Sequence, residues 1–357
     1  MSTTAEETAV DEVMGRIMAD LGGALGVLLT ALGTRSGLWA ALAGAGPLTA
    51  DEVAAKVAVA RPLVREWLAA QAAAGYLDYD PAAGTFTLPD AAAAAVHHGP
   101  GGALVDAAAT MFSSMGAGFA EFAEAFGAGK GFAWHQRTSD HWHGLDAFTR
   151  AAVPAELIAA TIGAMPDVAA ALATGGSAAD VGCGFGAPTL AIAGLYPAAQ
   201  VLGVDYHDAS IAHCRARAAQ DGRTNARFEV AAAADLPGSG YDLITFFDSL
   251  HDMGDPLGAL VRARSAVGLA GSVLLFEPAA ADDLAANLNP AGRMFYAIST
   301  VACTPNAVSQ QTPESGEPLG AQAGERRLRA LAATAGFGQV RRLDVPTPMN
   351  LVLDLRP

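Results

Sequence analysis

The sequence predicts an α/β protein in which a mainly parallel, doubly wound sheet with an antiparallel end follows a smaller, mostly helical domain. Three observations predict this class. From Ala178 onward, short apolar runs alternate with helix-length segments, which is the order of elements in a parallel sheet with crossover helices. The last two strand-like runs are joined only by PTPM, and so short a connection permits antiparallel pairing alone. The length of 357 residues favours two domains over one.

The N-terminal segment, residues 1–100, has the element order of a winged-helix domain. Residues 11–33 are apolar at helical spacing and predict a helix pair or one long broken helix. Thr49 is the expected N-cap of the next helix, because Asp51 and Glu52 follow it in the first turn. ARPLVREWLAAQAAAGYL predicts a further helix, and YLDYDPAAGTFTL predicts two short strands around a Pro/Gly turn.

The remainder of the chain divides into a connector and the sheet domain. Residues 101–173 predict a helical connector that contributes to a substrate pocket, and residues 174–357 predict the sheet domain. Parallel strands are expected at AADVGC, QVLGVD, ARFEVA, YDLITFF and SVLLFE. A helix at Gln322–Ala335 precedes GQVRRLDV and NLVLDLRP, the antiparallel pair. We therefore expect a Rossmann-like sheet of seven strands with an antiparallel C-terminal hairpin.

Charge and cysteine content exclude several classes of protein. A net charge of −15 argues against sequence-independent nucleic-acid binding and against docking on an anionic membrane. Cys183, Cys214 and Cys303 are odd in number and widely spaced, so we expect no disulfide framework and no zinc site. The start, MSTTAEETAVDEV, does not resemble a signal peptide, and Leu21–Thr34 is too short and glycine-rich to span a bilayer. These features predict a cytoplasmic protein without a membrane partner.

The strongest motif is Asp180-Val-Gly182-Cys-Gly184-Phe-Gly186, which follows a predicted strand and opens a helix. Glycines let the backbone turn sharply and approach a ligand closely. VLGVD then places Asp205 at the end of the second strand, where a carboxylate can accept hydrogen bonds from both ribose hydroxyls. The GxGxG spacing differs from the GxGxxG of dinucleotide folds, although a Rossmann-like fold with another nucleotide is the alternative.

A third acid, Asp235, follows the third strand in AADLP, where an adenine amino group would lie. Together with the glycine loop, these acids resemble the S-adenosylmethionine motifs of class I methyltransferases. The resemblance implies that the loop from Asp180 to Gly186 borders the methionine part of the cofactor. It also implies that Asp205 holds the ribose and that Tyr206 and Leu236 flank the adenine.

The candidate chemical residues follow the next two strands. His251 lies in FFDSLHDMGDP at the carboxyl end of a central strand, and histidine can act as a general base near neutral pH. Glu277 ends the following strand in FEP, and a carboxylate there can fix the imidazole tautomer and stabilise its protonated form. The alternative is that His251 is a structural residue at the strand end.

The LHDM segment resembles the LHDW motif of small-molecule O-methyltransferases of the caffeate and acetylserotonin type, which also begin with a winged-helix dimerisation domain. In those enzymes the matching histidine removes the proton of the acceptor hydroxyl and a glutamate supports it, which implies these roles for His251 and Glu277. Met253 stands where that family has tryptophan. Phe247 stands where plant members often carry a lysine near the cofactor, so Phe247 and Asp248 are expected beside the cofactor.

A second resemblance covers nearly the whole chain and rests on LHDMGDP, NLNPAGRMFYAIST, CTPNAVSQ, LGAQAGE and TPMNLVLDLRP. These segments are similar to a group of actinobacterial proteins described as winged-helix methyltransferases and sometimes as transcriptional regulators. The resemblance implies S-adenosylmethionine as cofactor and a small-molecule acceptor of unspecified identity. With the apolar run from Ile17 to Trp39, it also predicts a homodimer through the N-terminal domain.

Several further residues are expected to line an apolar acceptor pocket, with an ordinary core position as the alternative for each. These residues are Trp134, His135, Met253, Met294, Phe295, Tyr296 and Cys303. His141 and His143 lie near His135, but no cysteine or tight acidic set completes a coordination shell, so no metal is expected.

The leading hypothesis is S-adenosylmethionine-dependent methyl transfer to a small-molecule acceptor, with a hydroxyl as the favoured group. One alternative is a transcriptional regulator that binds S-adenosylmethionine. Against it, the third helix of the winged domain offers only Arg61 and Arg65 as basic residues, and Glu66 offsets them. A dimerisation or pocket-covering role is therefore favoured over DNA binding. The other alternative is a methyltransferase-like enzyme that uses the cofactor without transferring methyl.

Overall fold

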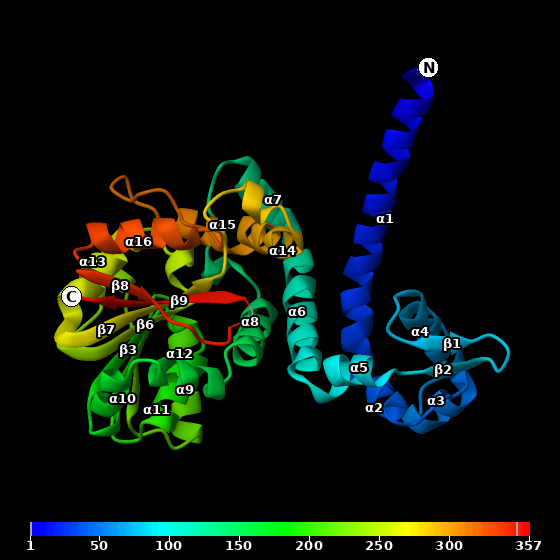
Figure 1. Cartoon of the computed structure of the whole chain (residues 1–357), viewed down its shortest axis with the longest axis horizontal. Coiled ribbons are helices and arrows are strands. Elements are labelled where there is room, and N and C mark those ends of the chain that lie inside the picture. The colour runs from blue at the N-terminus through cyan, green and yellow to red at the C-terminus, as the bar shows by residue number, and fades with distance from the viewer. Residues whose placement is uncertain (1, 348) are drawn as a thin grey trace. The chain divides into compact units, whose positions relative to one another are not determined.

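The computed structural model describes residues 2–347 and 349–357 and divides into two compact units (Figure 1). Unit 1 comprises Met1–Ser114 and His143–Ala152, and unit 2 comprises Met115–Trp142 and Val153–Pro357. Two helices, α6 and α8, contribute residues to both units; they span Pro100–Ala117 and Ser139–Ala152. The domain boundaries expected from the sequence stay a prediction.

Unit 1 contains the winged-helix order of elements. These are α1 Ser2–Arg35, α2 Leu38–Leu42, α3 Ala50–Val57, α4 Arg61–Ala73, β1 Asp78–Asp80, β2 Thr85–Thr87, α5 Asp90–Ala93 and a π-helical turn at Ala94–His98. Thr49 caps α3 as predicted, in a capping box with Glu52. The core of the unit forms around Trp39 and Trp67, whose ring centroids lie 4.6 Å apart. Gly33 of α1 packs on this pair, because a Cβ there would lie 2.5 Å from Trp39 Nε1.

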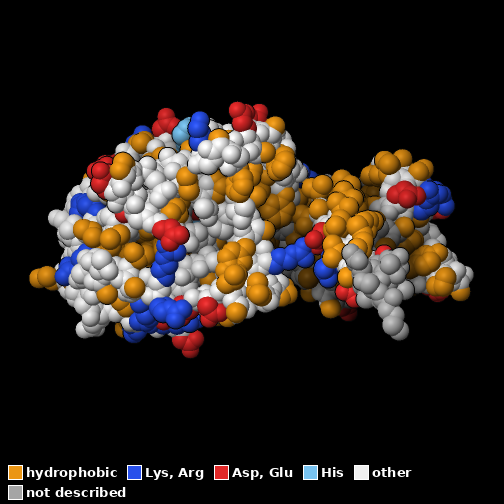
Figure 2. All heavy atoms as spheres, turned by 90° about the horizontal axis from the view of Figure 1, so that it is seen from above, with side chains coloured by type: hydrophobic (Ala, Val, Ile, Leu, Met, Phe, Trp, Pro, Cys, Tyr) orange, Lys and Arg blue, Asp and Glu red, His pale blue; other side chains and the backbone are white. Residues whose placement is uncertain are grey.

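Helix α1 corrects two expectations. It is continuous, whereas a helix pair or a broken helix was predicted, since glycine inside a helix costs only about 1 kcal/mol and no proline interrupts the segment. The segment Ala9–Arg35 is also long and apolar enough, by length and composition, to cross a membrane, whereas the sequence predicts an apolar stretch, Leu21–Thr34, that is too short to do so. The helix exposes large hydrophobic side chains: Val10, Val13, Met14, Ile17, Met18, Leu21, Leu25, Leu28 and Leu32. Figure 2 shows hydrophobic side chains gathered on the surface of unit 1.

Unit 2 is built on the predicted seven-stranded sheet, in the order β5-β4-β3-β6-β7-β9-β8. Its strands are β3 Ser177–Val181, β4 Gln200–Asp205, β5 Ala226–Val230, β6 Tyr241–Phe247, β7 Val267–Pro278, β8 Gln339–Arg342 and β9 Asn350–Arg356. The first five are parallel, and β9 pairs antiparallel with β8, as the short PTPM connection predicts, and also with β7. The strand order reverses between β3 and β6, and the crevice at such a switch point is where α/β sheets bind ligands.

Helices cover both faces of this sheet (Figure 1). The helices of unit 2 are α7 Phe119–Gly127, α9 Ala155–Gly163, α10 Pro166–Ala173, α11 Ala187–Leu195, α12 Asp208–Gln220, α13 Pro256–Ala266, α14 Pro290–Ile298, α15 Thr304–Ser309 and α16 Gly324–Thr334, besides the parts of α6 and α8 named above. Leu260 of α13 and Leu328 of α16 belong to the main core cluster with β3, β6, β7 and β9. Leu190 of α11 and Ile211 of α12 form a second cluster with Phe228 of β5. Burial on both faces explains why these strands are continuous apolar runs.

Candidate active site

The glycine loop leaves the carboxyl end of β3 with the backbone that its sequence predicts. Gly182, Gly184 and Gly186 have φ values of 70°, 52° and 77°, a region that favours glycine. A Cβ on Gly182 would lie 2.7 Å from Ser249 Cβ, so a larger residue has no room there. No heavy atom lies within 4 Å of a Cβ placed on Gly184, so the loop is open at its centre. A ligand can therefore approach the backbone of this loop closely.

Asp180 lies inside the sheet beneath this loop. It is 1% exposed, and its carboxylate accepts hydrogen bonds from Thr189 Oγ1 of α11 at 2.6 Å and from Thr245 Oγ1 of β6 at 2.8 Å. Burial raises the pKa of Asp180 to about 6, against the effect of these two bonds. Both carboxylate oxygens are thus engaged within the protein, and a direct contact of Asp180 with the cofactor stays a prediction.

Asp205 stands at the end of β4, next to the glycine loop. Its Oδ2 accepts a hydrogen bond from the Gly184 backbone N–H at 2.9 Å, and its Oδ1 accepts one from the His207 N–H at 2.9 Å. Burial raises the pKa of Asp205, and these N–H groups oppose the rise. The two bonds hold the carboxylate half-buried at the mouth of the loop, where its remaining lone pairs can accept from hydroxyl groups.

The three residues expected around the adenine differ in their exposure and in their contacts. Asp235 is exposed in a 3-10 turn, Ala233–Asp235, after β5. Leu236 is 1% exposed and belongs to the main core. Tyr206 points its phenol at Asn306, with the O–H donating to Oδ1 at 2.8 Å. Only Asp235 of these three is therefore exposed.

Phe247 and Asp248 end β6. Phe247 is buried against Phe276, with ring centroids 5.3 Å apart. Asp248 is one of two non-glycine residues with positive φ among the described residues, at 47°. Its Oδ1 accepts a hydrogen bond from Asn350 Nδ2 at 2.7 Å, and burial, together with the Glu277 carboxylate, raises the pKa of Asp248 to about 7. This strained acid lies at the strand end beside the candidate chemical residues.

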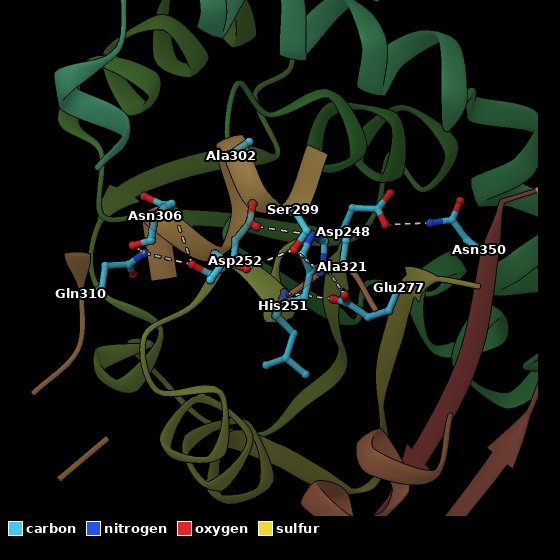
Figure 3. A network of polar contacts seen from close by, with 12 residues as sticks. Asp248, His251, Asp252, Glu277, Ser299, Ala302, Asn306, Gln310, Ala321 and Asn350 are labelled. Carbon is cyan, nitrogen blue, oxygen red and sulfur yellow. Dashed lines mark hydrogen bonds and ion pairs between the residues drawn. The ribbon is translucent and has the colours of Figure 1, made fainter. Parts of the chain in front are cut away.

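His251 and Glu277 meet as the sequence predicts (Figure 3). His251 lies on a 3-10 turn, Leu250–Asp252, and Glu277 lies near the end of the neighbouring strand β7. The distance from His251 Nδ1 to Glu277 Oε2 is 2.5 Å, and Glu277 Oε1 accepts from the Leu250 N–H at 2.9 Å. Both side chains are buried, at 4% and 1% exposure. Glu277 thus fixes both the turn and the imidazole.

The other imidazole nitrogen faces Asp252 and Cys303. His251 Nε2 lies 3.3 Å from Asp252 Oδ1, and that oxygen has no hydrogen-bond partner. The possible ligand atoms of His251, Asp252 and Cys303 lie within 4.8 Å of one another. Burial lowers the pKa of His251, but the Asp252 and Glu277 carboxylates outweigh it and raise that pKa well above its usual value. The two carboxylates thus favour the protonated form of the imidazole.

Asn306 of α15 links this turn to its surroundings, and sequence reasoning missed it. Its Nδ2 donates to the Asp252 carbonyl at 3.1 Å, where Gln310 Nε2 also donates at 3.0 Å (Figure 3). Its Oδ1 accepts from the Tyr206 phenol and from the Trp134 N–H at 3.3 Å. The residue lies in CTPNAVSQ, and no local spacing in that segment marks an asparagine for such a role.

The expected pocket residues are partly brought together. Trp134 and Phe295 pack against a cluster formed by Cys303, Ala302 and Ala321. Met253 packs against the main core, and its Cε lies 3.2 Å from where a Gly182 Cβ would be. The three remaining residues differ in exposure: His135 and Met294 are exposed and Tyr296 is half-buried. Trp134 of the connector and Phe295 thus come together at one cluster, and an acceptor pocket there stays a prediction.

Comparison with known proteins agrees with this architecture. Residues 173–324 match the family described as "Methyltransferase domain", and residues 23–98 match the "Rv2258c-like winged HTH domain". No curated protein matches the chain. The chain therefore carries a methyltransferase domain behind a winged helix-turn-helix domain. It is a methyltransferase enzyme, and the family and fold predicted from the sequence are confirmed.

Solved structures with the same fold extend over almost the whole chain. The S-adenosylmethionine-dependent methyltransferase SibL, in its apo form, has a TM-score of 0.66 and 21% identity over 96% of this chain and 99% of its own. Human N-acetylserotonin methyltransferase, solved with S-adenosylmethionine, has a TM-score of 0.61 and 17% identity over 96% and 97%. The O-methyltransferase NcsB1, solved with S-adenosylhomocysteine and 1,4-dihydroxy-2-naphthoic acid, has a TM-score of 0.61 and 20% identity over 96% and 98%. Their ligands are consistent with the expected cofactor.

Proposed function

We propose that this methyltransferase transfers the methyl group of S-adenosylmethionine to a hydroxyl group of a small molecule, with His251 as general base. The observation that supports it most is the 2.5 Å contact between His251 Nδ1 and Glu277 Oε2. A carboxylate on Nδ1 fixes the tautomer that leaves Nε2 as the working nitrogen and stabilises the imidazolium formed when Nε2 takes a proton.

The cofactor would lie over the glycine loop. The open space at Gly184 and the positive φ values of the three glycines fit a ligand that contacts the backbone there. Asp205 would hold the ribose hydroxyls and Asp235 the adenine amino group, while Tyr206, Leu236, Phe247 and Asp248 would border the cofactor. When bound, S-adenosylmethionine supplies an electrophilic methyl group on a sulfonium leaving group.

The chain's own residues would position the acceptor and move one proton. His251 Nε2 would accept the proton of the acceptor hydroxyl, so that the oxygen could take the methyl group that bound S-adenosylmethionine would supply. Glu277 offsets the positive charge that develops on the imidazole. Because His251 is already drawn toward the cationic form by Asp252, it must lose that proton before it can act as a base.

Two further elements belong to the proposal. We infer that α1 pairs with α1 of a second copy, since its exposed apolar side chains recur along the helix at spacings of three and four residues. A membrane-spanning role for the same helix is the competing outcome. The three free cysteines support a cytoplasmic location, because thiols persist in a reducing compartment.

Among the described residues, no contact specifically supports the alternative that the protein is a transcriptional regulator. In the winged domain, Arg61 pairs with Asp51 at 2.6 Å and Arg65 pairs with Glu66 at 2.6 Å, so both basic side chains of α4 are already engaged. Groove readers need several free phosphate contacts. The alternative of a non-methylating enzyme is tested together with the proposal, by following whether cofactor is consumed.

The test is turnover on a panel of phenols, naphthols and aliphatic alcohols, with formation of S-adenosylhomocysteine and of the methyl ether both measured. We expect equal amounts of the two products from hydroxyl acceptors. Turnover of the acceptor without loss of cofactor methyl would identify non-methylating chemistry. A mobility-shift assay at physiological salt, with nanomolar specific DNA binding, would instead support the regulator.

A further inference from the structure

Arg137 is a buried cation that neither the proposed reaction nor the sequence motifs account for. It lies between the 3-10 turn Trp134–Gln136 and α8, and it is 9% exposed. Its Nη2 donates to the carbonyl oxygens of Val301 at 2.9 Å and of Ala302 at 3.4 Å. Its Nε is buried and has no hydrogen-bond partner. The guanidinium is thus anchored at one nitrogen and unsatisfied at another.

Two aromatic rings hold the guanidinium plane. The guanidinium carbon lies 5.2 Å from the ring centroid of Phe132 and 5.2 Å from that of Trp134. These contacts stabilise a cation and fix its orientation, but they supply no hydrogen-bond acceptor. They leave the buried Nε of Arg137 without a hydrogen-bond partner among the described residues.

No carboxylate of residues 2–347 and 349–357 lies within ion-pair distance of Arg137. Burial accordingly lowers the pKa of Arg137, and the nearest opposing charges act only through space, Asp252 first among them. A buried guanidinium without a direct anionic partner costs free energy, and a bound anion would remove that cost. Among the described parts of the chain, this charge therefore has no direct partner.

The position of Arg137 is next to the candidate chemical residues. The carbonyl of Ala302, which its Nη2 contacts, immediately precedes Cys303, and Cys303 clusters with His251 and Asp252 within 4.8 Å. Trp134, which stacks on Arg137, packs in the same cluster as Cys303. The guanidinium is thus linked to the proposed base through Ala302 and Cys303.

We infer that Arg137 binds a carboxylate on the acceptor, so that the substrates of this enzyme are hydroxyaryl carboxylates. The planar fork of a guanidinium matches the two oxygens of a carboxylate, and the flanking rings of Phe132 and Trp134 match a flat aromatic body. The inference rests on the proposed function for the hydroxyl group, which His251 would receive while Arg137 holds the acid.

The first test uses the wild-type enzyme alone and needs no turnover. In the presence of S-adenosylhomocysteine, isothermal titration compares naphthalene-2-carboxylate with naphthalene-2-carboxamide. We expect the carboxylate to bind at least about tenfold more tightly, since a buried charge pair contributes affinity that the neutral amide lacks. Equal affinity, or tighter binding of the amide, overturns the inference.

The second test compares kcat/KM for hydroxynaphthoates and for the matching naphthols. Wild type should prefer the hydroxynaphthoates; Arg137→Gln should raise KM for them about tenfold or more and leave KM for naphthols unchanged, and Arg137→Lys should restore part of the preference. Arg65→Gln is the matched control, because Arg65 is exposed and pairs only with Glu66. An equal loss with both acceptors would mean that Arg137 only supports the fold or Asp252, and would overturn the inference.

The two hypotheses fail separately in these experiments. If hydroxyl acceptors are methylated regardless of their charge, the carboxylate site is wrong and the proposed function stands. If carboxylates bind through Arg137 but no hydroxyl is methylated, the proposed function is wrong and the anion site stands.

Discussion

Replacing Asp252 by asparagine should lower the pH at which His251 becomes an effective base. In the structure, Asp252 Oδ1 lies 3.3 Å from His251 Nε2, and this carboxylate is the first of the two that raise the pKa of His251 against the effect of burial. Asparagine keeps the size of the side chain and removes its charge. Only the neutral imidazole can accept the hydroxyl proton, so the rising limb of the pH profile reports this group.

The magnitude follows from the distance. A pair of unit charges at 3.3 Å interacts with about 1 kcal/mol in water and about 5 kcal/mol at an effective dielectric constant of about 20. Since about 1.4 kcal/mol corresponds to one pKa unit, the limb should move down by about one to four pH units. The Glu277 contact remains, so His251 keeps one stabilising carboxylate.

The assay is kcat/KM for a phenolic acceptor across a pH series at constant ionic strength. For wild type we expect the rising limb well above the ordinary histidine pKa, because the folded enzyme raises that pKa. His251→Ala should lower turnover by about a hundredfold to ten-thousandfold and remove the limb, and Glu277→Gln should lower turnover less. Asp221→Asn, at the exposed end of α12, is the matched charge control.

The reasoning fails if Asp252→Asn leaves the limb in place or moves it upward. It also fails if His251→Ala retains near-normal turnover at every pH, which would indicate an acceptor that needs no base. In either case the methyltransferase assignment is unaffected, since it does not depend on this histidine.

Three other predictions concern the cofactor, the stability and the assembly. Asp205→Ala should weaken S-adenosylhomocysteine binding about tenfold to a hundredfold in isothermal titration, since hydrogen bonds to a charged group are lost; unchanged affinity would contradict the ribose role. The pKa of Asp248 is raised to about 7 in the folded state, so folding takes up a proton and wild-type stability falls as pH rises from about 4 to 7. Asp248→Asn cannot ionise, tolerates positive φ, and should raise Tm more at pH 8 than at pH 5; an equal gain at both would refute this. Wild type should scatter light as a dimer and Ile17→Glu/Leu25→Glu as a monomer, whereas insolubility of wild type without detergent would point to a membrane role for α1.

The glycine loop and the strand ends could be predicted because local chemistry dictates them. Positive φ at Gly182, Gly184 and Gly186 needs residues without a Cβ, and apolar runs flanked by such turns form buried parallel strands. The pairing of His251 with Glu277 follows from the same logic, since carboxyl ends of neighbouring parallel strands meet at one edge. Sequence order and strand pairing thus suffice to bring these two residues together.

Other features of the fold and of the candidate site cannot all be derived from the spacing of residues in the sequence. Ala179 and Val181 face the main core, so the alternation of β3 turns Asp180 toward Thr189 of α11, and its contact with the cofactor stays a prediction. This orientation could be derived from the alternation of side chains along the strand. The continuity of α1 could not be derived from the sequence, because glycine weakens a helix without dictating a break.

The acceptor side is the part that sequence predicts least, and Arg137 shows why. Its environment is assembled from Phe132 and Trp134 on the connector and from the carbonyls of Val301 and Ala302, about 165 residues away in the chain. In WHQRTSD, an arginine between polar residues is indistinguishable from a solvated one. Arg137 is informative because no acidic partner lies within ion-pair distance of it among the described residues. This absence can be established only when the positions of all its neighbours are known. A buried charge that the fold leaves without an ion-pair partner is therefore the observation on which the inference of an acidic acceptor rests.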